Sequence, residues 1–577
     1  MGNPRAGSSP AFGTNIFMPE KSPAFFILRE KMKSFMNLED SKWTELIDRL
    51  WKKDVTIWSN DENVKKTIAN RLGWLDIHLK FESFKKPIFD FLKKLKEKGV
   101  TDAVLLGMGG SSLCPYMWSK IFGHLPKYPT FYVLDTTDPS EIKKIESKLN
   151  LDTTLFIVAS KSGTTIEPNS LYKYFYNLVS KRSKHPNNHF VAITDEGTPL
   201  ARLAIDENFL ALFINPKDIG GRYSALSFFG LVPATVMGIE VEVMIKNAKI
   251  MIEKCKREAK ENPAAKLAFF ITENLKKGRD KFTFLISEKI FPFALWVEQL
   301  LAESTGKDGK GVIPVVGEPL GHPYEYGDDR FFIKISYNND QTLKSVDNFP
   351  IFSINIKEIY ELAGEFFRWE MATAMISHFI GINPFDEPNV IESKKNTSML
   401  LERFKKNGKI DETLGEKDDE GFRFVASSNI DLSKDLKIAL KSFFSDIKKG
   451  DYVGLLAYLP YEEKIETGAI QFREIVRKKK HCATVFGFGP RYLHSTGQQH
   501  KGGPPTGRFI ILTREEKNMV EIPKEDFSFW HLQFAQAVGD FRALEAKGRK
   551  VIHIHLPVNF FQGFELFLEK VKEVLEI

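Results

Sequence analysis

Two segments of the chain combine glycine with hydroxyl side chains directly after an apolar run. They read LLGMGGSSLCP over 105–115 and FIVASKSGTT over 156–165. A phosphate dianion needs convergent hydrogen-bond donors and little steric bulk, which glycine N–H groups and Ser or Thr hydroxyls supply at a helix N-terminus. The first segment is not a nucleotide motif, because no GK[ST] follows it and position 112 is Ser instead of Gly. One such segment would read equally well as an ordinary turn, but the pair predicts a phosphate site.

The elements that must position these segments are short apolar runs that alternate with helical stretches. Five strand candidates surround the two segments, at 102–106, 130–135, 154–160, 189–194 and 209–214. Such alternation is typical of a parallel sheet that helices cover on both faces. The alternation returns later in the chain, with strand candidates at 282–287, 331–336, 350–356, 451–459, 481–488, 507–513 and 550–556.

The length of 577 residues is too great for one core. We therefore expect an α/β protein with two lobes, each a mainly parallel sheet flanked by helices. The boundaries that we predict are a flexible leader over 1–23, a helical segment over 24–97, a first lobe with the phosphate loops over 98–241, a helical connector over 242–279 and a second lobe over 280–577.

Composition excludes several classes of partner. The net charge of +7 is small for this length, and Lys is scattered among Glu and Asp, so no nucleic-acid partner is expected. A mild positive field would instead help to attract an anionic metabolite. The three cysteines are far apart, which argues against disulfides and thiolate metal sites and favours a reducing, cytoplasmic compartment. The longest uncharged run, 223–239, is slightly short for a membrane span and contains Pro233, so no membrane partner is expected.

The strings GMGGSSLCP and SKSGTTIEPN resemble the phosphate loops of the glucose-6-phosphate isomerase family, which has the sugar-isomerase (SIS) fold. The resemblance implies that Gly110 lies next to the substrate and that hydroxyls of both loops hold its phosphate. The implied phosphate-binding residues are Ser111, Ser160, Ser162 and Thr165, with Lys161 and Thr164 nearby. Glu167 matches a family glutamate in the same pocket, although a carboxylate in a first helical turn is also favoured by the helix dipole alone.

Two further strings extend the resemblance to the reacting carbons. GGRYS at 220–224 implies that Arg222 lies beside the substrate oxygens, where a guanidinium stabilises an enediolate. AESTGK at 302–307 resembles the family motif around the catalytic base and implies that Glu303 moves a proton between C2 and C1. Such a base must be partly desolvated, so that its proton affinity approaches the working pH. Glu298 lies on the same apolar stretch outside the motif, and a solvated helix residue is its expected state.

The sequence indicates the residues that would open the sugar ring less directly. FDEPNV at 385–390 resembles a family segment that has a lysine four residues after its valine, which implies Lys394, with Lys395 as the adjacent competitor. The family glutamine of this segment is Glu387 here. LHSTGQ at 493–498 implies that His494 is the ring-opening histidine. His322 stands 19 residues after Glu303, which fits the usual family order but not the motif, and we favour His494.

A histidine that follows both the base and the lysine is unusual for this family. The order, together with strings such as VEQLLAESTGKDGKGVIPVVGEP and FGFGPRYLHSTGQQHKGGPP, resembles the isomerase half of the bacterial fused transaldolase–glucose-6-phosphate isomerases. Only about forty residues precede the matched region, so transaldolase chemistry is not expected. In the common family the histidine reaches into the partner subunit, which suggests a homodimer. The altered order would instead let one chain complete its own site.

The resemblance implies reversible isomerisation of glucose 6-phosphate to fructose 6-phosphate, in glycolysis and gluconeogenesis, with no cofactor and no metal. Two alternatives stay open at this point. An isomerase for another aldose phosphate, such as mannose 6-phosphate, would share every phosphate contact. A non-catalytic sugar-phosphate-sensing protein of the same fold would keep the phosphate loops but would need no base.

Overall fold

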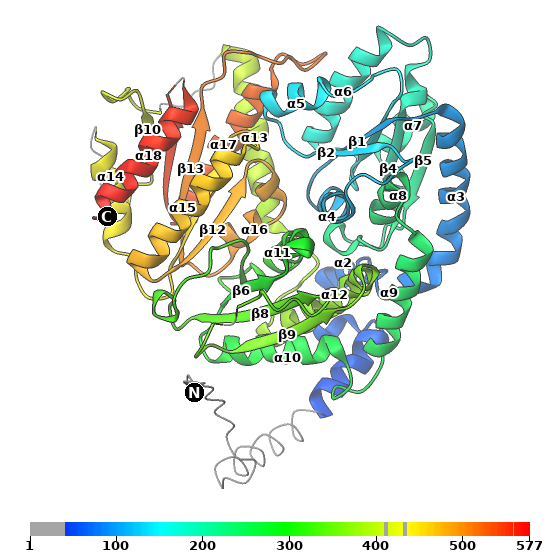
Figure 1. The fold of residues 1–577 in the computed structure, drawn as a ribbon, viewed down its shortest axis with the longest axis horizontal. Coiled ribbons are helices and arrows are strands. Elements are labelled where there is room, and N and C mark those ends of the chain that lie inside the picture. The colour runs from blue at the N-terminus through cyan, green and yellow to red at the C-terminus, as the bar shows by residue number, and fades with distance from the viewer. Residues whose placement is uncertain (1–40, 345, 409–413, 431–434, 558, 577) are drawn as a thin grey trace, which may run out of the picture.

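The computed structural model describes residues 41–577 except 345, 409–413, 431–434, 558 and 577. The predicted leader and the first part of the predicted helical segment, 24–40, therefore lie outside the described residues. The described chain begins with a helix from residue 41, followed by α2 (Glu62–Ala69) and α3 (Ile77–Lys98). Three sheets then follow one another along the chain (Figure 1).

The first sheet is parallel, with the strand order β2-β1-β3-β4-β5. Its central strands β1 and β3 pair along their full length, from Asp102 opposite Thr154 to Gly107 opposite Ala159. Because parallel strands end at the same edge, the two predicted phosphate loops, which follow β1 and β3, emerge side by side. The strands are β1 (Asp102–Gly107), β2 (Thr130–Leu134), β3 (Thr154–Ala159), β4 (Phe190–Asp195) and β5 (Ala211–Asn215), and the helices are α4 (Leu113–Phe122), α5 (Pro139–Glu146), α6 (Ile166–Ser180), α7 (Pro199–Asp206) and α8 (Phe228–Met237).

The second sheet is also parallel, with the order β7-β6-β8-β9. The segment 242–279 forms two helices, which separate where Asn262 caps the second one. Both helices pack against α12 and so belong to the core of this region. The strands are β6 (Lys281–Ile286), β7 (Ile313–Val315), β8 (Arg330–Tyr337) and β9 (Ile351–Ile356), and the helices are α9 (Val241–Cys255), α10 (Pro263–Lys276), α11 (Pro292–Thr305) and α12 (Leu362–Ile380).

The third sheet has the order β10-β14-β13-β11-β12 and is parallel apart from its edge strand β10. Long helices flank it, and two of them, α13 and α17, pack along each other towards the first sheet (Figure 1). The strands are β10 (Arg423–Ala426), β11 (Tyr452–Ala457), β12 (Ala483–Phe488), β13 (Gly507–Arg514) and β14 (Lys550–Leu556), and the helices are α13 (Pro388–Asn407), α14 (Leu436–Ser445), α15 (Glu463–Lys480), α16 (Gly497–Gly502), α17 (Phe529–Ala546) and α18 (Phe560–Val574).

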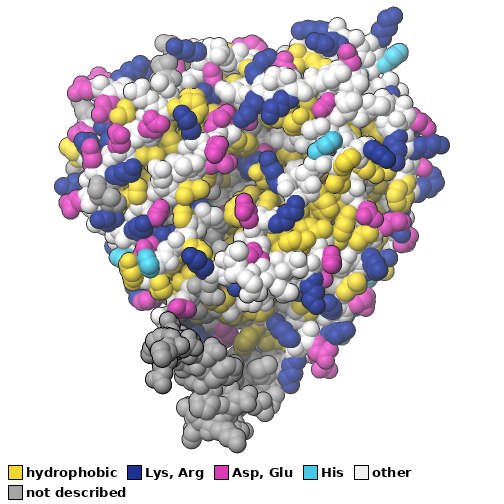
Figure 2. All heavy atoms as spheres, viewed as in Figure 1, with side chains coloured by type: hydrophobic (Ala, Val, Ile, Leu, Met, Phe, Trp, Pro, Cys, Tyr) yellow, Lys and Arg dark blue, Asp and Glu magenta, His cyan; other side chains and the backbone are white. Residues whose placement is uncertain are grey.

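The α/β class with mainly parallel sheets flanked by helices is confirmed. One large apolar cluster joins the N-terminal helices and the first two sheets through α11 and α12, and α11 lies near the centre of the molecule (Figure 1). Basic and acidic side chains intermingle across the face shown in Figure 2, as their scatter in the sequence suggests. Among the described residues, no helix combines the length and the apolar character that crossing a membrane requires.

Candidate active site

A cleft of about 450 Å³ opens where all three sheets meet around α11. Its walls come from segments that are far apart in the sequence: the loops after β1 and β3, the turn before α8, the end of α11, the start of α13 and the short helical turn η8 (Arg491–His494). The predicted site residues on its walls are Gly110, Ser111, Lys161, Ser162, Thr165, Arg222, Glu303, Glu387, Lys394 and His494.

The loop after β1 is held between two other walls of the cleft. Gly109 has a φ of +54°, and a Cβ on Gly110 would lie 2.2 Å from the carbonyl oxygen of Gly221, inside van der Waals contact. A Cβ on Gly109 would lie 2.7 Å from the carbonyl oxygen of His494. The glycines therefore let the loop touch the backbone of both the arginine turn and the histidine turn.

The hydroxyl groups of the loop after β3 have two roles: some fix the conformation of the loop, and others face the cleft. Ser160 is buried, donates to the Thr165 hydroxyl at 3.0 Å and accepts from the Gly163 N–H at 3.1 Å, so it fixes the form of the loop. Ser162 and Thr165 face the cleft, with Thr165 at the N-terminus of α6. The Thr164 hydroxyl lies 2.9 Å from that of Ser162 and borders a smaller adjoining cavity.

The side chain of Lys161 also borders the cleft and forms an ion pair with Asp195 at the end of β4. Together with the helix N-terminus, this loop offers the donors and the positive potential that a phosphate requires.

Arg222 is buried and held by five contacts. Its Nη1 donates to Glu303 Oε1 at 2.9 Å and to Glu387 Oε2 at 3.1 Å, and its Nε donates to Ser304 at 2.8 Å. Its Nη2 donates to two backbone carbonyl oxygens, of Pro384 at 2.7 Å and of Asp386 at 3.0 Å. Burial alone would lower the pKa of Arg222, but the two carboxylates hold it above its usual value. The guanidinium is thus a fixed positive charge beside Glu303.

Glu303 is a buried carboxylate at the end of α11. Its Oε2 accepts from Gln299 Nε2 at 3.1 Å, and the same amide nitrogen donates to the carbonyl oxygen of His494 at 2.8 Å. Burial raises the pKa of Glu303, the charge of Arg222 opposes that rise and the carboxylate of Glu387 adds to it. The proton affinity of Glu303 is therefore shifted in the direction that a general base needs.

Glu298 is not solvated, contrary to the expectation from the sequence. It is buried one turn and a half before Glu303, and burial raises its pKa to about 8. The cause is the apolar packing around α11, which covers nearly the whole circumference of that helix. Glu298 is not among the residues that line the cleft.

His494 forms a dyad with Glu167. Its Nε2 lies 2.9 Å from Glu167 Oε1, and the same oxygen accepts from Gln536 Nε2 at 2.7 Å. Burial alone would raise the pKa of Glu167, but the charge and the hydrogen bond of His494 bring it below its usual value. Glu167 lies in the first turn of α6, so the dipole also favours its charge. A buried carboxylate that accepts this hydrogen bond can hold the imidazole in a fixed orientation.

The structure distinguishes the predicted lysine and histidine from their competitors, Lys395 and His322. Lys394 is exposed on α13 and borders both the cleft and the adjoining cavity, whereas Lys395 borders neither. His322 stacks on Tyr324, with ring centroids 5.3 Å apart, and does not line the cleft.

Several residues that line or support the site were not predicted from the sequence, among them Gln299, Lys307 and Gln536. Gln299 could have been found, because it lies four residues before Glu303 on the same helix face. Lys307, in the AESTGK motif, bonds Asn383 O at 2.6 Å and Asp386 Oδ1 at 2.7 Å and so anchors the segment that carries Glu387. Gln536 lies on α17, and nothing in its local sequence signals a role.

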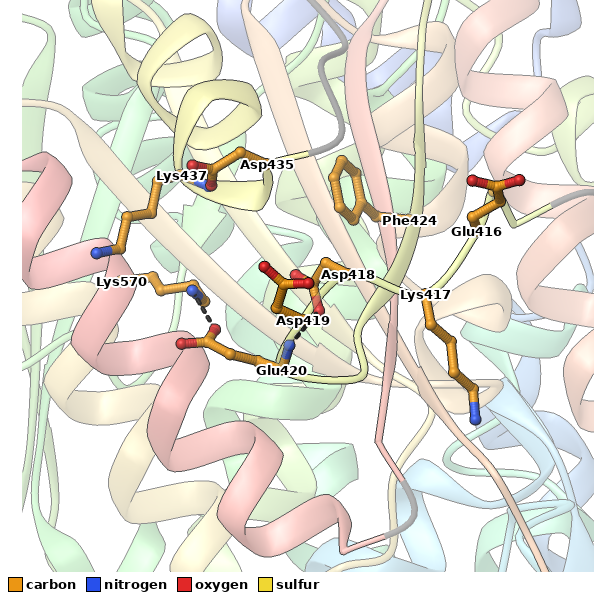
Figure 3. A pocket seen from close by; sticks show the side chains of 10 residues that line it. Glu416, Lys417, Asp418, Asp419, Glu420, Phe424, Asp435, Lys437 and Lys570 are labelled. Atoms are coloured by element: carbon orange, nitrogen blue, oxygen red, sulfur yellow. Dashed lines mark hydrogen bonds and ion pairs between the residues drawn. The ribbon is translucent and has the colours of Figure 1, made fainter.

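A larger hollow of about 890 Å³ lies at the outer side of the third sheet (Figure 3). Two of its charged side chains, Lys570 and Glu420, form an ion pair, and Asp418 Oδ1 accepts from the backbone N–H of Glu420 at 3.0 Å. Its lining includes none of the residues predicted from the sequence. Within the described ranges, no group of three or more His, Cys, Asp or Glu side chains is placed to hold a metal ion.

The chain is similar in sequence to several known proteins. Residues 77–313, which contain both phosphate loops, Arg222 and Glu303, match the model of the family described as phosphoglucose isomerase. A probable glucose-6-phosphate isomerase of Methanococcus maripaludis is 28% identical over 437 residues, which covers 67% of this chain and 93% of the relative. A glucose-6-phosphate isomerase of Bacillus cereus is 28% identical over 391 residues, covering 57% and 86%.

The fold has a counterpart among solved structures. A glucose-6-phosphate isomerase from Chlamydia trachomatis superposes with a TM-score of 0.50 at 18% identity, covering 64% of this chain and 84% of that one. At 18% identity the superposition shows a shared fold only. The similarity to this family rests on the sequence matches. Residues 77–313 thus match the phosphoglucose isomerase model, and about two thirds of the chain is similar to proteins named as glucose-6-phosphate isomerases.

Proposed function

We propose that this chain interconverts glucose 6-phosphate and fructose 6-phosphate, as an aldose–ketose isomerase of glycolysis and gluconeogenesis. The observation that carries the proposal is the buried Glu303 carboxylate, bonded to the fixed guanidinium of Arg222 in a cleft that both phosphate loops border. A protein that only senses sugar phosphates would need the loops but not this pair.

The phosphate is held by the loops after β1 and β3, through the hydroxyls of Ser111, Ser162 and Thr165 and the N-terminus of α6. Ser160 and Thr164 support this site by shaping the second loop. Anchoring the phosphate orients the other end of the sugar towards Arg222 and Glu303, which lowers the entropic cost of reaction.

Ring opening needs a group that protonates the ring oxygen and a group that accepts the C1 hydroxyl proton. His494, oriented by Glu167, and Lys394 are the groups assigned to this step, since both border the cleft. Glu303 then removes the proton from C2. The C1 carbonyl oxygen takes up negative charge beside Arg222, and the enediolate forms. The proton of the C2 hydroxyl passes to the C1 oxygen, and delivery of the proton from Glu303 to C1 then gives the C2 ketone.

Every group in this mechanism comes from one chain, so a single chain forms a complete site in this proposal. The three cysteines, Cys114, Cys255 and Cys482, are free and buried, which suits the reducing cytoplasm that we propose as the compartment.

The test is a coupled assay for glucose 6-phosphate formed from fructose 6-phosphate, on the wild type and on Glu303→Gln. We expect turnover by the wild type and a loss of about 10³-fold or more in the variant, because general-base catalysis contributes on this scale. A wild type that binds sugar phosphate but never turns it over would support the sensing alternative. Faster turnover of mannose 6-phosphate than of glucose 6-phosphate would favour the other isomerase.

A further inference from the structure

A buried ion pair joins the histidine turn to the first phosphate loop. We propose that Arg491 is a positioning residue for His494, and that it acts through Asp135 at the carboxyl end of β2. The proposal rests on the proposed function, because it concerns the ring-opening step of that reaction.

The pair is bidentate. Arg491 Nε donates to Asp135 Oδ2 at 2.8 Å, and Arg491 Nη2 donates to Asp135 Oδ1 at 2.7 Å. Asp135 is fully buried, and the side chain of Arg491 is 15% exposed. Two parallel bonds between planar groups fix the orientation of the guanidinium as well as its distance, which a single bond cannot do.

Two tyrosine rings enclose the guanidinium. The guanidinium carbon of Arg491 lies 4.5 Å from the ring centroid of Tyr116 on α4 and 4.7 Å from that of Tyr461, which precedes α15. Cation–π contacts with both rings keep water away from the pair and limit its movement. Tyr116 lies on a helix that flanks the first sheet, and Tyr461 lies in a loop that follows β11 of the third sheet. The two rings therefore hold the Arg491–Asp135 pair where these two sheets meet.

The same carboxylate reaches the phosphate loop. Ser112 Oγ donates to Asp135 Oδ2 at 3.2 Å and lies next to Ser111, which borders the cleft. On the other side, Arg491 begins the helical turn that His494 ends. A single buried carboxylate thus holds the phosphate loop and the histidine turn at a fixed separation.

A second connection runs from the same turn to the partner of His494. Thr137 Oγ1 donates to Gln536 Oε1 at 3.0 Å, and Gln536 Nε2 donates to Glu167 Oε1 at 2.7 Å. The turn after β2 therefore reaches both members of the His494–Glu167 dyad, one through Arg491 and the other through Gln536. The consequence is that the dyad is aligned with respect to the anchored phosphate, where the sugar ring must open.

The chain offers a matched control. Arg514 on β13 is also buried and donates to an aspartate of the same turn, with its Nη2 3.1 Å from Asp138 Oδ2. It supports the same junction but belongs to a strand that carries no residue of the cleft. Arg→Lys keeps the charge and removes the planar fork, so Arg491→Lys and Arg514→Lys impose the same chemical change at the two places.

The experiment separates ring opening from proton transfer. Ring opening is measured as enzyme-catalysed exchange between the anomers of glucose 6-phosphate by NMR, and binding is measured with sorbitol 6-phosphate, which has no ring to open. We expect Arg491→Lys to slow anomer exchange about 10- to 100-fold, since small misplacements of a catalytic group have effects of this size. Sorbitol 6-phosphate affinity should change less than about threefold, and Arg514→Lys should leave anomer exchange near the wild-type rate.

A double-mutant cycle decides whether the effect passes through His494. In a His494→Ala background, Arg491→Lys should cause no further loss beyond about twofold, because the group that it positions is gone. Equal losses in both backgrounds would overturn the proposal, as would a normal rate in Arg491→Lys. Asp135→Asn, which keeps the shape of the carboxylate, should reproduce the loss and replaces Arg491→Lys if that variant does not fold. A wild type without isomerase activity would instead refute the proposed function.

Discussion

Replacing Glu387 by glutamine should make the enzyme active at lower pH. Glu387 shares Arg222 Nη1 with Glu303, and its carboxylate raises the pKa of Glu303. The variant removes that negative charge and leaves Arg222 to serve Glu303 alone. Both changes stabilise the ionised base, so the pKa of Glu303 should fall. Because the base must be ionised to act, the acid limb of kcat/KM should move to lower pH.

The size of this shift follows from the geometry. The two carboxylate oxygens each lie within about 3 Å of the same nitrogen, so they are at most about 6 Å apart. Two unit charges about 6 Å apart interact by about 0.7 kcal/mol in bulk water and by about 3 kcal/mol at an effective dielectric constant of about 20. One pKa unit corresponds to about 1.4 kcal/mol, so these limits are about 0.5 and 2 units.

Solvent screening favours the lower part of that range, since the side chain of Glu387 is 42% exposed. We therefore expect the acid limb to move down by about 0.5 to 1 unit. The assay is kcat/KM against pH for the wild type and Glu387→Gln, at constant ionic strength. Glu392→Gln is the control, because Glu392 lies in the first turns of α13, which begins directly after Glu387 in the chain, but pairs with Lys547 outside the cleft. An acid limb that stays in place or moves up in Glu387→Gln would refute the coupling between the two carboxylates.

Three other outcomes follow from the structure. Gly110→Ala should lower kcat/KM by about 10²-fold or more, because its Cβ would meet the Gly221 carbonyl oxygen at 2.2 Å and displace the arginine turn; activity within twofold of the wild type would contradict this. A mixture of His494→Ala and Glu303→Gln chains should stay inactive after joint refolding, since one chain supplies both groups to its cleft; recovered activity would mean that subunits share sites. Glu298→Gln should gain stability relative to the wild type between pH 5 and pH 8. Burial raises the pKa of Glu298 from 4.5 to about 8, so the folded wild type binds the proton more tightly and loses stability as pH rises through this range, by up to a few kcal/mol. Denaturant melts at both pH values measure this, and a constant difference between the proteins would disagree with a buried Glu298.

Much of the fold was predictable from the sequence, because buried parallel strands read as apolar runs. All five strands of the first sheet lie within two residues of their predicted positions. Two strands were missed, β7 and β10, which are short and lie at sheet edges. Their pairing comes from neighbours that are distant in the chain, which a local pattern does not record. The same reason explains why two sheets after residue 280 were not distinguished.

One part of the candidate site was predictable from the sequence, and another part was not. Ser162, Arg222 and Glu303 were predicted, because each lies in a short motif, and the structure brings them to one cleft. Their roles stay predictions until variants are measured. Gln536 and the pair of Arg491 with Asp135 were not predicted, because their contacts join segments more than three hundred residues apart and depend on how the first and third sheets meet. Glu298 was placed in solvent because a single glutamate on a helix carries no sign of the packing around it.

The central claim is that Glu303 carries a proton between C2 and C1, and the fate of a hydrogen label tests it most directly. Glucose 6-phosphate with deuterium at C2 is converted to fructose 6-phosphate, and the label is followed by NMR in the sugar and in the solvent. A single carboxylate that serves both carbons should return part of the label to C1 and lose the rest to water. Glu303→Gln should abolish both the transfer and the loss while sorbitol 6-phosphate still binds. Label transfer to C1 at the wild-type rate in Glu303→Gln would contradict the account.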